Sequence, residues 1–240
     1  MVRICYIMAM RAEAQPLIDH YRLERQEDFF APLPCQLHTG TADGGCELYV
    51  VTNGVQHDRD LVGCEAATVA AMAAIERLNP DLVVCSGTCG GWKRYGTEVG
   101  RVYLGDAVMF HDRRIPDDNE WGTQSLGNYP VWGGTKELAA RLGLETGKVT
   151  TGSSFDMTKE DEDIIGRHGG RLKETEGAAV AFVCSLFHKP LLLVKAVTNL
   201  RDAGCDDMAT FHANLRRASN ELLKANARII ALLAKGEIAI

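Results

Sequence analysis

The sequence predicts an α/β fold, a three-layer sandwich in which a mixed, mostly parallel central sheet lies between layers of helices. Short β-rich apolar segments alternate along the chain with helical segments of about 10 to 15 residues, the pattern of consecutive β–α–β units. Several of the apolar segments are continuous rather than alternating, which is typical of strands buried on both faces of a sheet. Because no repeat or linker interrupts the pattern, we expect residues 1–240 to form a single domain.

The N-terminal half predicts a strand, a helix, a hairpin and a second helix. Residues 3–10 are rich in β-formers and lead directly into a segment with helical apolar spacing, residues 11–23. Residues 36–54 contain two apolar runs joined by the Asp-Gly-Gly turn signal at 43–45. The alanine-rich segment 67–78 consists of strong helix formers, and an Asn-Pro pair then ends it.

The C-terminal half continues the alternation. Residues 81–91 and 191–199 are continuous apolar runs that predict buried strands, and residues 99–112 predict another long strand. Four further segments have the apolar spacing of helices, the last of them long and amphipathic: 135–144, 158–168, 176–188 and 208–234.

The composition is that of an ordinary soluble globular protein. The chain has 240 residues, 46% apolar and 24% charged, with a net charge of −6. A pI near 5.7 argues against a protein devoted to nucleic-acid binding. No apolar run approaches the roughly 20 residues that span a bilayer, and the start of the chain does not resemble a signal peptide. We therefore expect a cytoplasmic protein without a nucleic-acid or membrane partner.

The cysteines are expected to be reduced residues of the core. The chain has eight, without a C-x-x-C pair or a histidine cluster at zinc-ligand spacing. Small free thiols are among the most frequently buried side chains. Neither a metal nor a cofactor is expected. Five cysteines lie in or beside apolar runs: Cys5, Cys64, Cys85, Cys89 and Cys184.

Candidate site residues follow the predicted strands, since ligands of open α/β sheets bind beyond the carboxyl ends of the strands. The glycine-rich segment Ser86–Gly91 is neither a G-x-G-x-x-G nor a Walker motif, so it predicts either close backbone approach to a ligand or a tight strand-to-helix turn. The pair Thr198-Asn199 ends the last buried strand and suits either a ligand or a turn. Residues 111–114 (HDRR) favour an exposed charged turn.

Two carboxylates stand at strand ends, Glu13 after the first strand and Glu176 before an apolar helix. Each suits a helix-capping role, because a negative charge stabilises a helix N-terminus. They could instead converge on one pocket, where one activates water and the other fixes a hydroxylated ligand.

Together, and in this order, the motifs resemble the purine and uridine phosphorylase superfamily, and within it the plant-type methylthioadenosine/S-adenosylhomocysteine nucleosidases. The resemblance runs over almost the whole chain, from IMAMRAE at 7–13 to the C-terminal helix. It rests on five further segments: SGTCGG (86–91), VMFHDRRIP (108–116), TTGSSFDM (150–157), ETEGAAVAFV (174–183) and VKAVTNLRD (194–202).

The resemblance implies a nucleoside phosphorylase-like fold and cleavage of the bond between a purine base and a (thio)ribose by water, without a metal. Glu13 would activate the water, helped by Thr88, and Glu176 would hold the ribose hydroxyls. Phe155 would stack on the base, and the backbone at Asp156 would read its edge. The other implied substrate contacts are Ala9, Met10, Cys89, Gly90, Thr175, Thr198 and, beside the 5′ substituent, Phe211.

Two further properties follow from the same resemblance. The family's members pair as homodimers that lend residues across the interface, for which His111 and Ile115 are the candidates here. Phosphorylases carry an arginine before their glycine turn that holds phosphate, and this chain has Cys85 at that position. Phosphate would therefore be bound poorly unless Lys195 or Arg11 took the place of that arginine.

This sequence departs from the family pattern at the site itself. Asn199 stands where the family has an aspartate that protonates the departing adenine, so the reaction is expected to be impaired. Thr175 stands where the nucleosidases have a methionine that packs beneath the ribose. Ser153 stands where the family has an aspartate, and Lys195 stands where bacterial members commonly have an arginine.

Three interpretations of Asn199 remain open. It is an engineered near-isosteric replacement, or it marks a preference for 6-oxopurines, because an amide can donate hydrogen bonds to N7 and O6 of such a base. Alternatively, it marks a nucleoside-binding or storage protein that has lost catalysis. The 5′ substituent remains open, as does the pathway: methionine salvage, methyl-cycle clearance, purine salvage or a specialised pathway.

Overall fold

The computed structural model of this chain describes residues 1–42, 44–115, 120–204 and 207–240. Three positions used above therefore lie outside the described residues: Asp43 of the predicted hairpin turn, Pro116 at the end of the HDRRIP segment, and Cys205.

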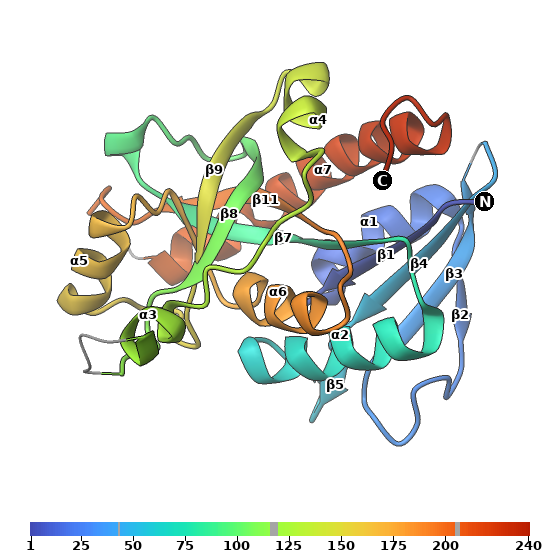
Figure 1. Cartoon of the computed structure of the whole chain (residues 1–240), viewed down its shortest axis with the longest axis horizontal. Coiled ribbons are helices and arrows are strands. Elements are labelled where there is room, and N and C mark those ends of the chain that lie inside the picture. Colours follow the sequence, from blue (N-terminus) through green and yellow to red (C-terminus); the bar gives the residue numbers. More distant parts are fainter. Residues whose placement is uncertain (43, 116–119, 205–206) are drawn as a thin grey trace.

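A mixed sheet forms the centre of the molecule (Figure 1), with strand order β10-β9-β8-β11-β7-β1-β4-β3-β2 in the described chain. The neighbours β4, β1, β7 and β11 run parallel, as do β8, β9 and β10, whereas β11 and β8 are antiparallel. The strands are β1 (Arg3–Met8), β2 (Glu24–Gln26), β3 (Gln36–Ala42), β4 (Cys46–Thr52), β7 (Leu82–Gly91), β8 (Val102–Phe110), β9 (Glu145–Thr151), β10 (Leu172–Glu174) and β11 (Leu191–Leu200). A small separate ribbon pairs β5 (Val55–Gln56) with β6 (Arg59–Asp60).

Helices cover both faces of the sheet, which confirms the predicted α/β sandwich. The helices α1, α4 and α7 pack in one apolar core with one face, and α2 and α6 pack in a second core on the other face. The chain also forms α3 and α5 and a single turn of 3₁₀ helix, η1. The bounds are α1 (Arg11–Tyr21), α2 (Cys64–Leu78), η1 (Lys93–Tyr95), α3 (Glu120–Leu126), α4 (Thr135–Leu142), α5 (Lys159–Arg167), α6 (Gly177–Leu186) and α7 (Asp207–Ala234).

One half of the sheet closes on itself, a feature that is not predicted from the sequence. The short strand β10 pairs in parallel with β9 and also antiparallel with the end of β7, where Leu172 lies opposite Gly91 and Lys173 opposite Gly90. Because β7, β11, β8 and β9 are already neighbours, this pairing completes a ring of five strands. The cavity described below lies at the end of this ring.

The glycine segment is part of strand β7, so the alternative of a tight strand-to-helix turn is wrong. Residues Ser86–Gly91 continue the pairing of β7 with β11. The absence of a side chain is required at Gly91, where a Cβ atom would lie 2.3 Å from Cγ2 of Thr97. Glycine here lets Thr97 pack directly against the end of β7 without a clash.

The described cysteines are free thiols; Cys64 is half-buried and the other six are buried. Within the described ranges, every helix is too short or too polar to cross a membrane.

Candidate active site

A cavity of about 320 Å³ opens where β1, β7, β10 and β11 end and α7 begins. This volume is at the lower end of the range of small-molecule sites. Twelve of the predicted site residues line it: Ala9, Met10, Glu13, Thr88, Cys89, Gly90, Phe155, Thr175, Glu176, Thr198, Asn199 and Phe211.

Glu13 is fixed in the cavity wall by three donors. Its Oε1 accepts hydrogen bonds from the backbone N–H and the hydroxyl of Thr88, at 2.6 and 2.8 Å, and its Oε2 accepts from the backbone N–H of Met10 at 3.3 Å. The contact with Met10 is a helix-start bond, so the capping interpretation is partly correct, but the carboxylate also faces the cavity. Gly87 gives it room, because a Cβ atom there would lie 3.1 Å from Oε1.

Burial and the negative charge of Glu176 raise the pKa of Glu13 to about 7. The carboxyl is therefore a general base only above this pH, because its protonated form cannot accept a proton. We expect kcat/KM for base release to fall about tenfold per pH unit below a midpoint near 7. A profile from pH 5 to 9 tests this expectation, and a rate that stays constant down to pH 5 would exclude Glu13 as the titrating base.

Glu176 is available to a ligand because another carboxylate caps its helix. Oε2 of Glu174 accepts from the backbone N–H groups of Glu176 and Gly177, at 3.1 and 2.7 Å, and so satisfies the start of α6. Glu176 instead turns toward α2, where its Oε1 accepts from the N–H of Gly63 at 2.9 Å and from the hydroxyl of Thr175 at 2.7 Å. The capping interpretation is therefore wrong for Glu176.

Lys195 neutralises Glu174 in the interior. The ammonium lies 2.8 Å from Oε2 of Glu174, and both side chains are almost fully buried. Burial alone would raise the pKa of Glu174, but the charge of Lys195 and hydrogen bonds from Thr151 and Gly177 hold it below its usual value. Glu174 therefore stays ionised beside Glu176, and burial followed by this charge raises the pKa of Glu176.

The pair between Lys195 and Glu174 should be important for stability. We expect Lys195→Met to lower the free energy of unfolding by about 3–5 kcal/mol, because it leaves a buried carboxylate unpaired. Arg141→Met is the matched control, since Arg141 pairs with Glu137 on the surface and should change stability little. Denaturant unfolding measures both variants; similar small losses would contradict the buried charge pair.

A β-bulge brings Thr198 and Asn199 to the same side of β11. Successive residues of a strand normally point to opposite faces. Here Val197 lies opposite Cys89 and Asn199 lies opposite Gly90, so Thr198 is the extra residue and both side chains reach the cavity. The hydroxyl of Thr198 lies 2.9 Å from Oδ1 of Asn199. These two residues therefore belong to the site and are not a simple turn.

Two aromatic rings form an apolar part of the wall. Phe155 and Phe211 meet edge to face, with centroids 5.6 Å apart. The ammonium of Lys173 donates to the carbonyl oxygens of Ser154 and Phe155, at 2.7 and 3.1 Å, and so holds the segment that carries Phe155. Asp156, expected to read the base with its backbone, lies outside the set of residues that line the cavity.

His111 differs from its predicted place in an exposed turn. Its side chain is buried with 2% exposure, and a Cβ atom on Gly152 would lie 2.4 Å from its Nε2. Burial lowers its pKa to about 4. A ring buried within its own chain is not on the surface that a second subunit would meet, so that expectation for His111 is corrected. Ile115 is 41% exposed and lies outside the cavity wall.

Eight further residues line the cavity that the sequence does not predict as substrate contacts. Ser153 departs from the family pattern. Lys173, Glu174 and Arg201 are charged residue types that are usually exposed, so their burial beside the cavity has no signal in the sequence. The eight are Val62, Gly63, Glu65, Ser153, Lys173, Glu174, Arg201 and Met208.

The cations considered for phosphate binding are already paired. Lys195 lies against Glu174 and 3.4 Å from Sγ of Cys85, and Arg11 pairs with Asp60 at 2.7 Å on the exposed side of the molecule. Cys85 itself is buried. Neither Lys195 nor Arg11 is therefore available to hold phosphate. Among the described side chains, His, Cys, Asp and Glu do not cluster in groups of three or more that could hold a metal ion.

Comparison with known families assigns this architecture. The family model described as the phosphorylase superfamily matches residues 3–234. A match over nearly the whole chain, together with the sheet and the cavity at its end, places this protein in that superfamily. The predicted family and fold are thereby confirmed.

Nucleosidases are among its similar relatives. A 5′-methylthioadenosine nucleosidase of Arabidopsis thaliana is 36% identical over 88% of this chain and 80% of its own length. A 5′-methylthioadenosine/S-adenosylhomocysteine nucleosidase of the same plant is 32% identical over 96% of this chain and 91% of its own. The apo structure of Arabidopsis thaliana 5′-methylthioadenosine nucleosidase superposes with a TM-score of 0.93 at 33% identity, covering 97% of this chain and 96% of that one.

Proposed function

We propose that this protein is a purine nucleosidase that hydrolyses the N-glycosidic bond of 5′-methylthioadenosine or S-adenosylhomocysteine-type nucleosides to free base and (thio)ribose. The observation that carries this proposal is the placement of Glu13 and Glu176 in one cavity beside Asn199 and two aromatic rings. The names of the two plant relatives support the same substrate class.

The geometry supports different roles for the two carboxylates, Glu13 and Glu176. Above pH 7 the carboxylate of Glu13, oriented by Thr88, takes a proton from water as the oxygen bonds to the anomeric carbon. Glu176 holds the sugar hydroxyls and stabilises the positive charge that develops on the ring. The electron pair of the breaking bond passes to the base nitrogen. An amide cannot supply a proton, so solvent protonates the departing base.

Base release tests this proposal directly. With methylthioadenosine, S-adenosylhomocysteine, adenosine and inosine as substrates, we expect adenine to be released from the first two faster than hypoxanthine from inosine. Faster hypoxanthine release would establish the 6-oxopurine alternative. Tight nucleoside binding without release of any base would favour a binding or storage protein.

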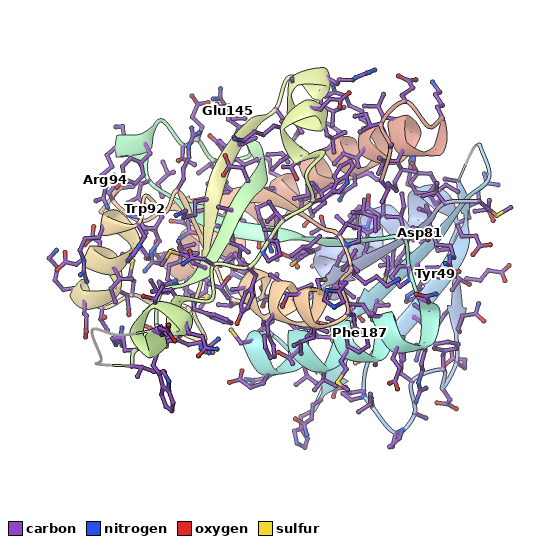
Figure 2. The ribbon with its side chains drawn as sticks, viewed as in Figure 1. Tyr49, Asp81, Trp92, Arg94, Glu145 and Phe187 are labelled. Carbon is purple, nitrogen blue, oxygen red and sulfur yellow. The ribbon has the colours of Figure 1, made fainter. Side chains whose placement is uncertain are left out.

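We further propose that the protein is a homodimer, built on the face formed by α2 and α6. These helices lie side by side (Figure 1), and Phe187 lies at the end of α6 beside α2 (Figure 2). Exposed apolar side chains gather on this face, as is typical of an interface: Val69, Met72, Phe182, Leu186 and Phe187. Light scattering should give a dimer that Leu186→Glu converts to a monomer; a monomeric parent protein would contradict the proposal.

We propose one domain over the whole chain, which the length of the family match supports, and a cytoplasmic location, which the free cysteines suit. Cleavage of methylthioadenosine would give the protein a place in methionine salvage.

A further inference from the structure

Arg201 and Asp207 form an ion pair beside Asn199, and we propose that this pair fixes the amide of Asn199 with its nitrogen toward the base. Asn199 then acts as a hydrogen-bond donor that selects purines with an acceptor at N7, and Asp207 acts as a positioning residue. The inference rests on the proposed function, because it takes a purine as the occupant of the cavity.

The three side chains form a continuous chain of contacts. Nδ2 of Asn199 donates to Oδ1 of Asp207 at 2.9 Å, and Oδ2 of Asp207 lies 2.6 Å from Nη1 of Arg201. The guanidinium side chain is only 6% exposed and lines the cavity, whereas Asp207 lies outside the set of lining residues. Asp207 is also the first residue of α7, where the helix dipole favours a negative charge. The ion pair and the helix N-terminus both suit a carboxylate at this position.

The carboxylate decides which way the amide faces. The hydroxyl of Thr198 lies 2.9 Å from Oδ1 of Asn199 and 3.1 Å from the carbonyl oxygen of Cys89. Its one hydrogen can go to the amide oxygen, or it can go to Cys89 while the hydroxyl accepts from an amide nitrogen, so Thr198 is compatible with either orientation. An ionised carboxylate only accepts hydrogen bonds, and the reversed amide would place two oxygens against each other. Asp207 therefore selects the orientation in which Nδ2 faces it and Oδ1 faces Thr198.

One amide hydrogen remains for a ligand in this orientation. Nδ2 carries two hydrogens, and Asp207 takes one of them. The nitrogen lies at the cavity wall, where a Cβ atom on Gly90 would be 3.5 Å from it. N7 of a purine is an acceptor that this hydrogen can meet. A preference for 6-oxopurines would require separate hydrogen bonds from Nδ2 to N7 and to O6 of the base. The second of these needs a hydrogen that Nδ2 already donates to Asp207.

Binding of free bases tests the inference without requiring catalysis. Calorimetry compares adenine with 7-deazaadenine, which has a C–H in place of the N7 acceptor, for the parent protein, Asp207→Ala, Asn199→Ala and the double variant. We expect Asp207→Ala to weaken adenine binding about tenfold and to leave 7-deazaadenine binding unchanged. In the Asn199→Ala background, Asp207→Ala should have no further effect, because Asp207 acts through the amide.

Controls separate positioning from general damage. Glu221→Ala removes another acidic residue of α7, paired with Lys224 away from the cavity, and should leave both affinities unchanged. If Asp207→Ala does not fold, Asp207→Asn serves instead, since a neutral amide accepts either orientation of Asn199 and should also weaken adenine binding selectively.

Three results would overturn the inference: equal losses for both bases, a further loss from Asp207→Ala in the Asn199→Ala background, or no preference of the parent protein for adenine over 7-deazaadenine. A parent protein that prefers adenine but releases no base from any nucleoside would refute the proposed function and leave this inference standing.

Discussion

Glu13→Gln is expected to lower the rate of base release by at least about 10²–10⁴-fold while nucleoside binding is retained. Glutamine keeps the shape of the side chain and an oxygen that can accept from Thr88, although it loses the long hydrogen bond from the N–H of Met10, and it cannot take a proton from water. Single-turnover kinetics measures the chemical step, and calorimetry with adenine measures binding.

Thermal stability distinguishes this catalytic role from a structural one. The pKa of Glu13 is raised to about 7, so ionising the buried carboxyl costs free energy in the folded state above that pH. Glu13→Gln removes that cost and should not lower the melting temperature at pH 8. Glu137→Gln, an exposed carboxylate on α4, is the matched control for activity. Retained turnover in Glu13→Gln would remove Glu13 from the mechanism.

Asn199→Asp is expected to raise the release of adenine by about 10²–10⁴-fold, the usual contribution of a general acid. The position favours a protonated carboxyl. Asp207 accepts a hydrogen bond from this position at 2.9 Å, so a carboxyl that replaces the amide is placed to carry a proton there. That proton can then be delivered to the departing base.

Asn199→Ala is the control for this gain, because it removes the amide without adding an acid and should not increase turnover. The two variants are compared by steady-state release of adenine from methylthioadenosine at pH 7. An unchanged rate in Asn199→Asp would show that Asn199 does not occupy the position of the missing acid, and would favour a binding or storage function.

The fold could be predicted because its signals are local. Continuous apolar runs mark β1, β7 and β11, and the carboxyl ends of these strands carry Glu13, Thr88 and Asn199. Parallel strands bring such ends together, so the principal site residues followed from their positions alone. The phosphorylase superfamily model, which matches residues 3–234, confirms the predicted fold.

The parts that could not be predicted depend on contacts between distant segments. Strand β10 has only three residues, LKE, and is a strand because it joins β9 to β7 and closes the ring. Lys173 and Glu174 belong to it and are residue types that are usually exposed, yet both are buried, and Glu174 pairs with Lys195 from β11. Neither the strand pairing of β10 nor the ion pair of Glu174 with Lys195 produces a periodic pattern within a single segment of the sequence.

Two further features have the same cause. The HDRR segment has the composition of a solvated turn, but His111 packs beneath Gly152, which is far away in the sequence. The ion pair joins Arg201, just after β11, to Asp207 at the start of α7, and Asp207 in turn accepts a hydrogen bond from Asn199. The contacts of Asn199 therefore had to come from the structure.

The most direct test of this account is the reaction of the protein with methylthioadenosine, with and without phosphate, followed by mass analysis of the sugar product. We expect slow release of adenine that does not need phosphate, and free methylthioribose as the sugar even when phosphate is present. Release that requires phosphate, with methylthioribose 1-phosphate as the product, would contradict hydrolysis by a water that Glu13 activates.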